Sequence, residues 1–323
     1  MRHDKKRFIK RSLQVFISSF LAVAVIGAVV FVTQGREIPV LNPSGTIAQQ
    51  QYILILITVG LGIFVIVPVF ILLFAVAWRY RASNKKAKYD PELEGSRVLE
   101  IIWWTIPCLI ILALAVITYI STHALDPYKA LESDKIPVKV QVIATEWNWL
   151  FIYPEQGTAT LNYMNIPEDT PINIEVTSDA PMNTFWVPAL AGQVYAMSGM
   201  SSKLHLMADN PGTYNGSTTN ISGEGYASLR FKVYSMKEAD FMAWSKQAAS
   251  SADALTNNSY AEISDYTASK PEMTYMLMAP SLYNDVIMKY MHAEKQTEST
   301  KKEDETQHDA HSEAHSHHEG MSH

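Results

Sequence analysis

Residues 53–78 read ILILITVGLGIFVIVPVFILLFAVAW, and no charged side chain interrupts them. The hydrocarbon core of a bilayer is about 30 Å thick, and an α-helix crosses it in about 20 residues. Residues 101–120, IIWWTIPCLIILALAVITYI, form a second uncharged run of sufficient length. Pro68 and Pro107 are tolerated in helices that cross a membrane. Two buried helices of a soluble protein are the alternative, but such long uninterrupted runs favour two transmembrane helices.

A further apolar stretch, residues 13–32, lies close to the N-terminus. It follows a basic arm, as the apolar part of a secretory signal peptide does. The stretch is long for a signal peptide and is followed by no clear small-x-small cleavage motif, so an uncleaved anchor is favoured slightly. The lone cysteine, Cys108, lies within the second transmembrane run, so neither a lipid-modified N-terminal cysteine nor a disulfide is expected.

The distribution of basic residues predicts which side of the membrane each segment faces, because cytoplasmic loops are enriched in Lys and Arg. The N-terminal arm carries six of them, whereas residues 34–51 carry only Arg36. The connection after the first long run opens with RYRASNKKAK, residues 79–88, and is basic again. The N-terminus and this connection are therefore expected in the cytoplasm, and everything after Ile120 outside.

The outer part of the chain has the pattern of a β-domain. In residues 136–149, Val138, Val140 and Val142 alternate with polar Lys139 and Gln141, as in a half-buried strand. Segments rich in Pro, Gly and Asn separate further strand candidates, and short strands at this spacing predict a β-sandwich or barrel. The other candidates are residues 158–163, 172–178, 201–208 and 227–234.

Composition limits the function classes. The 323 residues have a formal net charge of −6, and their basic residues cluster around the apolar runs rather than in a stripe, so nucleic-acid binding is not expected. After Met236 the pattern becomes helical, and the last thirty or so residues are polar and of low complexity. The predicted division is a basic arm with an apolar signal or anchor (1–34), a helical hairpin (35–126), a β-domain (127–236), a helical segment (237–293) and a disordered His-rich tail (294–323).

Several motifs resemble subunit II of the haem-copper respiratory oxidases, over roughly residues 40–290. The pattern Glu-x-x-x-Trp-Thr-x-Pro is present as Glu100, Trp104, Thr105 and Pro107. Residues 146–155, EWNWLFIYPE, are similar to the tryptophan-rich segment of the family, and residues 183–188, NTFWVP, to its His-Ser-Phe-Trp-Val-Pro motif. The resemblance implies two transmembrane helices, or three if the first apolar stretch is retained, followed by a cupredoxin-like Greek-key β-sandwich and a short C-terminal helical segment.

The cytochrome c oxidase branch of this family binds two copper ions through two Cys, two His, a Met and a Glu carbonyl. Aligned on Gly216 and Gly223, residues 216–229 read GSTTNISGEGYASL. Hydroxyls, amides and a leucine cannot replace the thiolates and imidazoles that a copper pair requires. No metal site is therefore expected at the corresponding positions, which are Asn183, Thr218, Asn220, Ser222, Tyr226 and Leu229.

Loss of these ligands resembles the quinol oxidase branch, the cytochrome bo-type enzymes. Residues 81–85, 122–125 and 195–200 also fit that branch. The resemblance implies a complex that oxidises ubiquinol, reduces O₂ to water and pumps protons across a bacterial inner membrane. It further implies that the haems and one copper lie in subunit I, that subunits III and IV are additional partners, and that this chain is an accessory subunit without a cofactor or a cytochrome c partner.

Glu100 is the one candidate for a functional side chain. A carboxylate at the cytoplasmic start of a helix also stabilises the positive end of the helix dipole, which is the alternative interpretation. In the family, an acid here lies at the entrance of a proton path into the catalytic subunit, and this role is favoured. Trp147 and Trp149 are expected to pack the domain rather than to transfer electrons.

The His-rich tail supports a competing function. Clustered imidazoles bind copper or zinc, so a membrane-tethered metal-binding or metal-delivery protein is the alternative. Adventitious metal binding is favoured over a built site, because the tail is acidic and has no predicted structure around it. The tail holds six of the ten histidines: His308, His311, His315, His317, His318 and His323.

Overall fold

The computed structural model describes residues 38–81, 84, 95–223, 225–265 and 269–291. The N-terminal arm with the first apolar stretch, most of the basic connection and the His-rich tail lie outside the described residues. The predicted boundaries within the chain stay predictions. The described residues from Pro43 onward form one compact unit.

The two predicted transmembrane helices are confirmed. Helix α2 (Thr46–Arg79) and helix α3 (Arg97–Ala124) have 34 and 28 residues, and both are long and apolar enough to cross a membrane. Both continue into polar residues beyond the apolar runs, and Pro68 and Pro107 lie inside them. Most of their large apolar side chains are exposed, as expected for surfaces that lipid or another subunit covers. A 3₁₀ turn, η1 (Pro39–Leu41), precedes α2.

The start of α2 is attached to the β-domain by its backbone. The Ser44 N–H donates to the Ala189 carbonyl at 2.7 Å, and the Asp209 N–H donates to the Ser44 carbonyl at 3.0 Å. A Cβ added to Gly45 would lie 2.8 Å from the Leu190 carbonyl oxygen, so the two backbones meet more closely than any side chain allows. The first turn of α2 is therefore part of the folded domain as well as of the membrane segment.

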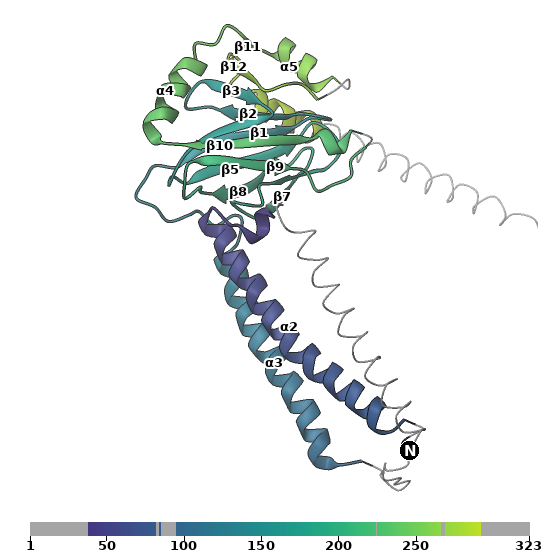
Figure 1. Cartoon of the computed structure of the whole chain (residues 1–323). Coiled ribbons are helices and arrows are strands. Elements are labelled where there is room, and N and C mark those ends of the chain that lie inside the picture. The colour runs from purple at the N-terminus through teal and green to yellow at the C-terminus, as the bar shows by residue number, and fades with distance from the viewer. Residues whose placement is uncertain (1–37, 82–83, 85–94, 224, 266–268, 292–323) are drawn as a thin grey trace, which may run out of the picture. The chain divides into compact units, whose positions relative to one another are not determined.

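The predicted β-sandwich is confirmed, and it consists of two sheets (Figure 1). The first has the strand order β11-β12-β3-β2-β1-β5-β8, and the second the order β4-β10-β9-β6-β7. The first comprises β1 (Val138–Ala144), β2 (Trp149–Tyr153), β3 (Thr158–Leu161), β5 (Ile172–Ser178), β8 (Ser202–Leu206), β11 (Ala254–Leu255) and β12 (Met273–Leu277). The second comprises β4 (Tyr163–Pro167), β6 (Asn183–Trp186), β7 (Gln193–Ala196), β9 (Gly212–Ser217) and β10 (Arg230–Met236).

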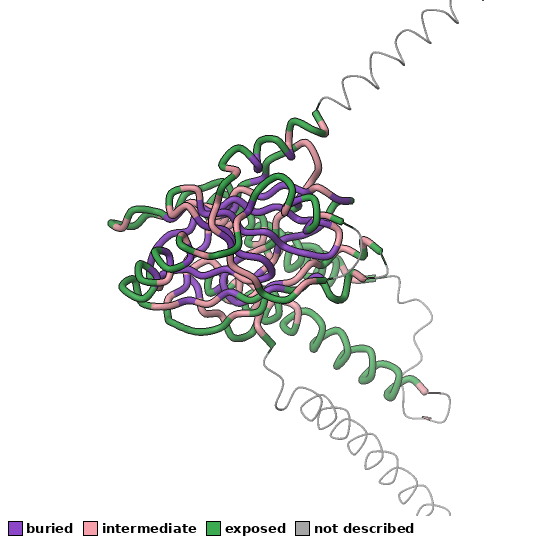
Figure 2. Tube along the Cα trace, turned by 90° about the horizontal axis from the view of Figure 1, so that it is seen from above, coloured by how far each residue is buried: buried purple, intermediate pink, exposed green. Residues whose placement is uncertain are grey.

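The alternation seen in β1 places its valines in the core between the sheets. Val138, Val140 and Val142 are buried there, and Figure 2 shows the buried residues gathered inside the sandwich. On the opposite face, Lys139 Nζ lies 3.1 Å from a carboxylate oxygen of Glu175 on the neighbouring β5. The period of two in the sequence therefore indicated both the strand and its buried face correctly.

Some strand boundaries differ from the prediction. Residues 136–149 are not one strand: β1 ends at Ala144, and a turn closed by the Thr145 N–H to the Asn148 carbonyl leads into β2. The strand expected at 227–234 begins only at Arg230, because η2 (Tyr226–Ser228) forms a 3₁₀ turn before it. Seven strands were not predicted at all: β2, β4, β6, β7, β9, β11 and β12.

The predicted C-terminal helical segment is confirmed, but it also contains two strands that the sequence did not predict. It contains α4 (Glu238–Ala248), α5 (Asn257–Ser264) and helical residues 282–291, but also β11 and β12. Strand β12 pairs antiparallel with β3, so the segment extends the first sheet. A second buried cluster, on the outer face of that sheet, joins side chains of β1, β2 and β3 to the C-terminal segment; it includes Ile143, Leu150, Ile152, Leu161, Leu255, Ile263, Tyr275 and Val286.

Candidate functional site

The positions that correspond to the copper ligands lie at the start of β6 and in the loop between β9 and β10. Thr218 directly follows β9 and Leu229 directly precedes β10, and the Thr218 N–H donates to the Leu229 carbonyl at 3.3 Å. The Thr184 N–H of β6 donates to Thr218 Oγ1 at 3.2 Å. The fold therefore brings the start of β6 and the β9–β10 loop together.

Thr218 and Asn220 organise the loop through hydrogen bonds. Thr218 Oγ1 accepts from the Asn220 N–H at 3.3 Å in addition to the Thr184 N–H. The Asn220 side-chain amide donates to the Met182 carbonyl at 3.1 Å, which connects the loop to the residue before β6. The side chains of Thr218 and Asn220 therefore hold the loop against the start of β6 by hydrogen bonds to backbone groups.

The other positions differ in burial. Asn183 is fully buried, and its Oδ1 and Nδ2 have no hydrogen-bond partner among the described residues. Ser222 Oγ is likewise buried without a partner in the described part of the chain. Leu229 is 1% exposed and packs in the core between the sheets, whereas Tyr226 lies in the 3₁₀ turn and is 37% exposed.

This set of side chains does not fit a pair of copper ions. The positions offer hydroxyls, amides, a phenol and an alkyl group, and the thiolates and imidazoles that copper pairs require are missing from them. Leu229 has no donor atom and serves packing instead. No group of three or more His, Cys, Asp or Glu side chains that could hold a metal occurs among the described residues, and the six tail histidines lie outside them.

The two tryptophans of the 146–155 segment pack the domain, as predicted. The Trp149 ring is fully buried, with its centroid 5.6 Å from that of Phe185 and 5.5 Å from that of Phe231. The Trp147 ring lies against the loop: a Cβ on Gly225 would come within 2.7 Å of it. The sequence analysis did not identify Gly225 as the residue against which the Trp147 ring packs. The only signal was a second glycine close to Gly223, which is typical of a close contact with the backbone.

Comparison with known proteins decides the family. Residues 44–120 match the family described as "Cytochrome C oxidase subunit II, transmembrane domain", and residues 154–236 match its periplasmic domain. The cytochrome bo(3) ubiquinol oxidase subunit 2 of Pseudomonas putida is 44% identical over 250 residues, which are 77% of this chain and 80% of that protein. The chain belongs to the haem-copper oxidase subunit II family.

Two further members of the subunit II family show how widely the similarity extends. The ubiquinol oxidase subunit 2 of Acetobacter aceti is 39% identical over 258 residues, covering 79% of this chain and 84% of the relative. The quinol oxidase subunit 2 of Bacillus subtilis is 39% identical over 246 residues, covering 75% and 77%. As a subunit II, the chain is membrane-anchored by its two apolar helices, with its β-domain on the periplasmic side.

Glu100 lies in the first turn of α3, on the cytoplasmic side of this subunit II. It is exposed, and its Oε1 is directed back toward Gly95, where an added Cβ would lie 3.5 Å away. The Ser96 side chain does not cap the helix, so the carboxylate is the acidic group at the helix N-terminus. This geometry is compatible with both the capping role and the proton-uptake role.

Asp179 is an organising residue that the sequence did not reveal. It follows β5 and its side chain is 3% exposed. The phenols of Tyr260 and Tyr290 donate to it at 2.7 and 2.8 Å, and Lys289 Nζ donates at 2.7 Å. The hydrogen bond to Asp179 raises the pKa of Lys289, and burial raises the pKa of Tyr260. One carboxylate thus anchors α5 and the C-terminal helix to the sandwich.

Proposed function

We propose that this chain is subunit II of a proton-pumping ubiquinol oxidase that reduces O₂ to water, and that it holds no dinuclear copper centre. Relatives in P. putida and A. aceti, at 44% and 39% identity, are named as subunits of ubiquinol oxidases. The observation that carries the proposal is the set of side chains at the six copper-ligand positions. A donor set of amides, hydroxyls and a leucine supports electron entry from a quinol in the membrane instead of an outer copper relay.

In this proposal the chain has an accessory role. The haems and one copper belong to subunit I, which α2 and α3 contact through their exposed apolar faces. Subunits III and IV complete the complex, and cytochrome c is not a partner. The β-domain covers the periplasmic face of the catalytic subunit.

The test is to purify the complex through this chain and to measure O₂ uptake with a ubiquinol analogue, a menaquinol analogue and reduced cytochrome c. We expect uptake with ubiquinol, little with menaquinol and none with cytochrome c, and copper in the amount of one ion per complex. Turnover with cytochrome c, or two additional copper ions, would contradict the proposal. Purification of the chain without a haem-bearing partner would favour the tethered metal-binding protein instead.

We further propose that Glu100 belongs to the entrance of a proton-uptake path. Glu100→Gln removes the ionisable group while keeping its shape, so we expect several-fold slower O₂ consumption by an assembled complex, with partial recovery in Glu100→Asp. The measurement is turnover and proton release in reconstituted vesicles. Asp126→Asn, just after the other end of α3, is the matched control and should leave turnover unchanged. Equal rates for Glu100→Gln and the wild type would leave only the helix-capping role.

A further inference from the structure

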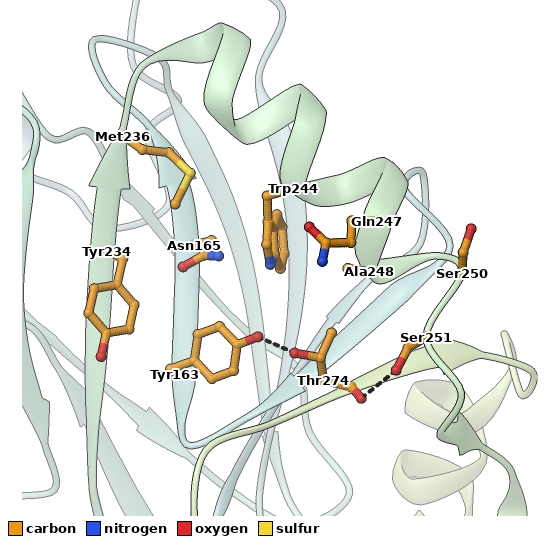
Figure 3. Close-up of a pocket in the computed structure, with 10 residues that line it drawn as sticks. All are labelled: Tyr163, Asn165, Tyr234, Met236, Trp244, Gln247, Ala248, Ser250, Ser251 and Thr274. Atoms are coloured by element: carbon orange, nitrogen blue, oxygen red, sulfur yellow. Dashed lines mark hydrogen bonds between the residues drawn. The ribbon is translucent and has the colours of Figure 1, made fainter.

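The β-domain has an open pocket of about 660 Å³ between helix α4 and the strands β4 and β10 (Figure 3). Strand β12 and the residues that follow α4 complete its lining. Sites for small molecules have volumes of about 300 to 1,000 Å³. None of the six copper-ligand positions belongs to this lining, so the function proposed above does not account for the pocket.

Three aromatic side chains from three different elements line the pocket. Tyr163 of β4, Tyr234 of β10 and Trp244 of α4 stand around one space in Figure 3, and we call them the aromatic cage. Each of the three is partly exposed, whereas the neighbouring Tyr153 and Phe241 are buried in the core. A molecule in the pocket can therefore contact all three rings without a change of the fold.

The rings of the aromatic cage are held in place by their neighbours. The centroid of the Trp244 ring lies 5.4 Å from that of Tyr153 and 5.5 Å from that of Phe241. The rings of Tyr163 and Tyr234 meet edge to face at 6.0 Å, and the Tyr163 hydroxyl is hydrogen-bonded to β12. Side chains that are already fixed lose little freedom when a ligand binds, so the cage is preorganised.

The faces of the three rings are not occupied by cations of the protein itself. An aromatic ring has a quadrupole whose negative face attracts a positive charge. Arg81 stacks on Trp78 and Lys289 on Tyr290, but no Lys or Arg among the described residues stacks on a ring of the aromatic cage. No described residue in the lining is charged. The cage can therefore accept a cation from outside.

Glu272 places a negative charge at one side of the aromatic cage. The Tyr234 hydroxyl donates to its carboxylate, whose oxygens lie at 3.1 and 3.2 Å. Lys232 Nζ is 4.0 Å from Oε1 of Glu272, and both side chains are exposed, so this ion pair neutralises the carboxylate only weakly. The charge of Glu272 therefore adds to the attraction of the rings for a cation.

The polar groups of the lining decide which kind of cation fits. A protonated amine needs acceptors for its N–H groups, and no carboxylate is among the described residues of the lining. A quaternary ammonium group has no N–H to satisfy and binds to the faces of aromatic rings. Gln247 and Ser250 are exposed in the lining and can hydrogen-bond to a hydroxyl or carboxylate elsewhere in the ligand.

We propose that the aromatic cage binds a quaternary ammonium group. The methyl groups around the nitrogen contact the rings of Tyr163, Tyr234 and Trp244, and Glu272 balances the charge from the side of Tyr234. Two sources carry this group, a small free molecule such as choline or glycine betaine and the headgroup of a phosphatidylcholine lipid.

The proposal is tested with the full chain, or the complex that contains it, in nanodiscs of phosphatidylethanolamine and phosphatidylglycerol, which contain no quaternary ammonium. Choline, glycine betaine and tetramethylammonium are the probes, and calorimetric titration is the readout. The control ligand is 3,3-dimethylbutanol, which has the shape of choline but no charge. We expect choline to bind about tenfold more tightly than this control, because only the cation is attracted to the ring faces. Equal affinities for the two, or no binding of any probe, would overturn the proposal.

A second titration distinguishes the two sources of the group. If the lipid headgroup is the ligand, nanodiscs that also contain phosphatidylcholine should lower the apparent affinity for choline, because the headgroup then occupies the cage. If a free molecule is the ligand, the affinity for choline should be the same in both kinds of nanodisc.

Substitutions at and beside Tyr234 separate the cage from the fold. Tyr234→Leu removes one ring and should weaken choline binding about fivefold. Tyr226→Leu removes an aromatic residue that is 37% exposed but lies outside the pocket, so it should leave the affinity unchanged.

Glu272→Gln guards against a Tyr234→Leu protein that does not fold, because Glu272 is exposed and its size is kept. It should weaken choline binding about threefold with an unchanged thermal midpoint, whereas Lys232→Gln should strengthen binding about twofold. Wild-type affinity for choline in both Tyr234→Leu and Glu272→Gln would contradict the proposal.

Discussion

At the scale of single residues, Asp179 connects three parts of the chain that are far apart in sequence. Its carboxylate follows β5, and its partners Tyr260, Lys289 and Tyr290 come from two C-terminal helical stretches. The carboxylate is almost completely buried, so each partner compensates for lost hydration. Hydrogen bonds to a charged group contribute more than neutral ones, about 1.5 to 3 kcal/mol.

Asp179→Asn should therefore lower the free energy of unfolding by about 2 kcal/mol, since an amide retains the shape but loses the charge that all three donors face. Denaturation of the purified chain, followed by tryptophan fluorescence, measures this change. Asp285→Asn is the control, because Asp285 is exposed and accepts from the nearby Ser281. A loss as small as that of the control would mean that the carboxylate is not an anchor.

His205 provides a prediction of pH dependence. Burial, and next the charge of Lys203, lower the pKa of His205 below 6.5. The unfolded state then binds a proton at a higher pH than the folded state does, so the stabilisation is complete above about pH 6.5 and is lost as the pH falls below it. We expect a lower unfolding midpoint at pH 5.5 than at pH 8, and a smaller difference in His205→Gln. His123→Gln, in the exposed last turn of α3, should keep the wild-type difference.

The sequence identified candidate site residues only where they lie within a motif of the family. The alignment on Gly216 and Gly223 singled out Thr218 and Leu229, and in the structure their backbones are hydrogen-bonded where the β9–β10 loop begins and ends. Asp179 carried no local signal. Its importance depends on burial and on distant partners, which a linear pattern does not contain.

At the scale of elements, helix α2 has two environments. Its first turn contacts the β-domain, where Ala48 is buried and its N–H donates to the Leu190 carbonyl at 3.3 Å. The remainder is exposed and apolar, as a membrane requires. Gly45, the residue before the helix, permits this change because its backbone contacts carbonyls that a side chain would displace.

Gly45→Ala should lower the free energy of unfolding of the domain by about 2 kcal/mol, because the new methyl group meets backbone atoms that cannot rotate away. The unfolding of the purified chain is the measurement. Gly60→Ala is the matched change within α2, where no atom of the described chain lies within 4 Å of the added carbon, and it should be neutral or slightly stabilising. Similar losses in both variants would refute a specific contact at Gly45.

Element prediction was most accurate where a single periodicity extended over the whole element. The candidate at 172–178 coincides with β5, and both apolar runs lie inside the observed helices. Strand β2, WLFIY, was missed because every residue in it is buried, so it shows no alternation. Both faces of the first sheet are covered, and a strand of that kind reads as a continuous apolar run.

At the scale of the whole molecule, the C-terminal segment completes the sandwich. Strand β12 extends the first sheet beyond β3, and α5 with residues 282–291 covers the outer face of that sheet. Ile143, Leu150 and Ile152 are at most 1% exposed there. Removing the cover would expose a contiguous apolar surface, which favours aggregation.

Truncation after Ser250 should therefore yield a chain whose β-domain is degraded or aggregates, whereas removal of residues 292–323 alone should leave the contacts of the outer cluster intact. Limited proteolysis of membranes that contain either variant distinguishes them: we expect a stable β-domain fragment only in the second case. A protease-resistant domain after the first truncation would show that β1 to β10 fold without the cover.

The sequence by itself determined the membrane anchor, the orientation, the presence of a β-sandwich and the membership in the subunit II family. These follow from the length of apolar runs, from the charges around them and from motifs of consecutive residues, all of which are local. The tertiary structure alone decided that the C-terminal segment adds strands to the first sheet and that Asp179 anchors it. Those features arise from contacts between residues a hundred positions apart, and burial and pairing at that range depend on how the sheets pack.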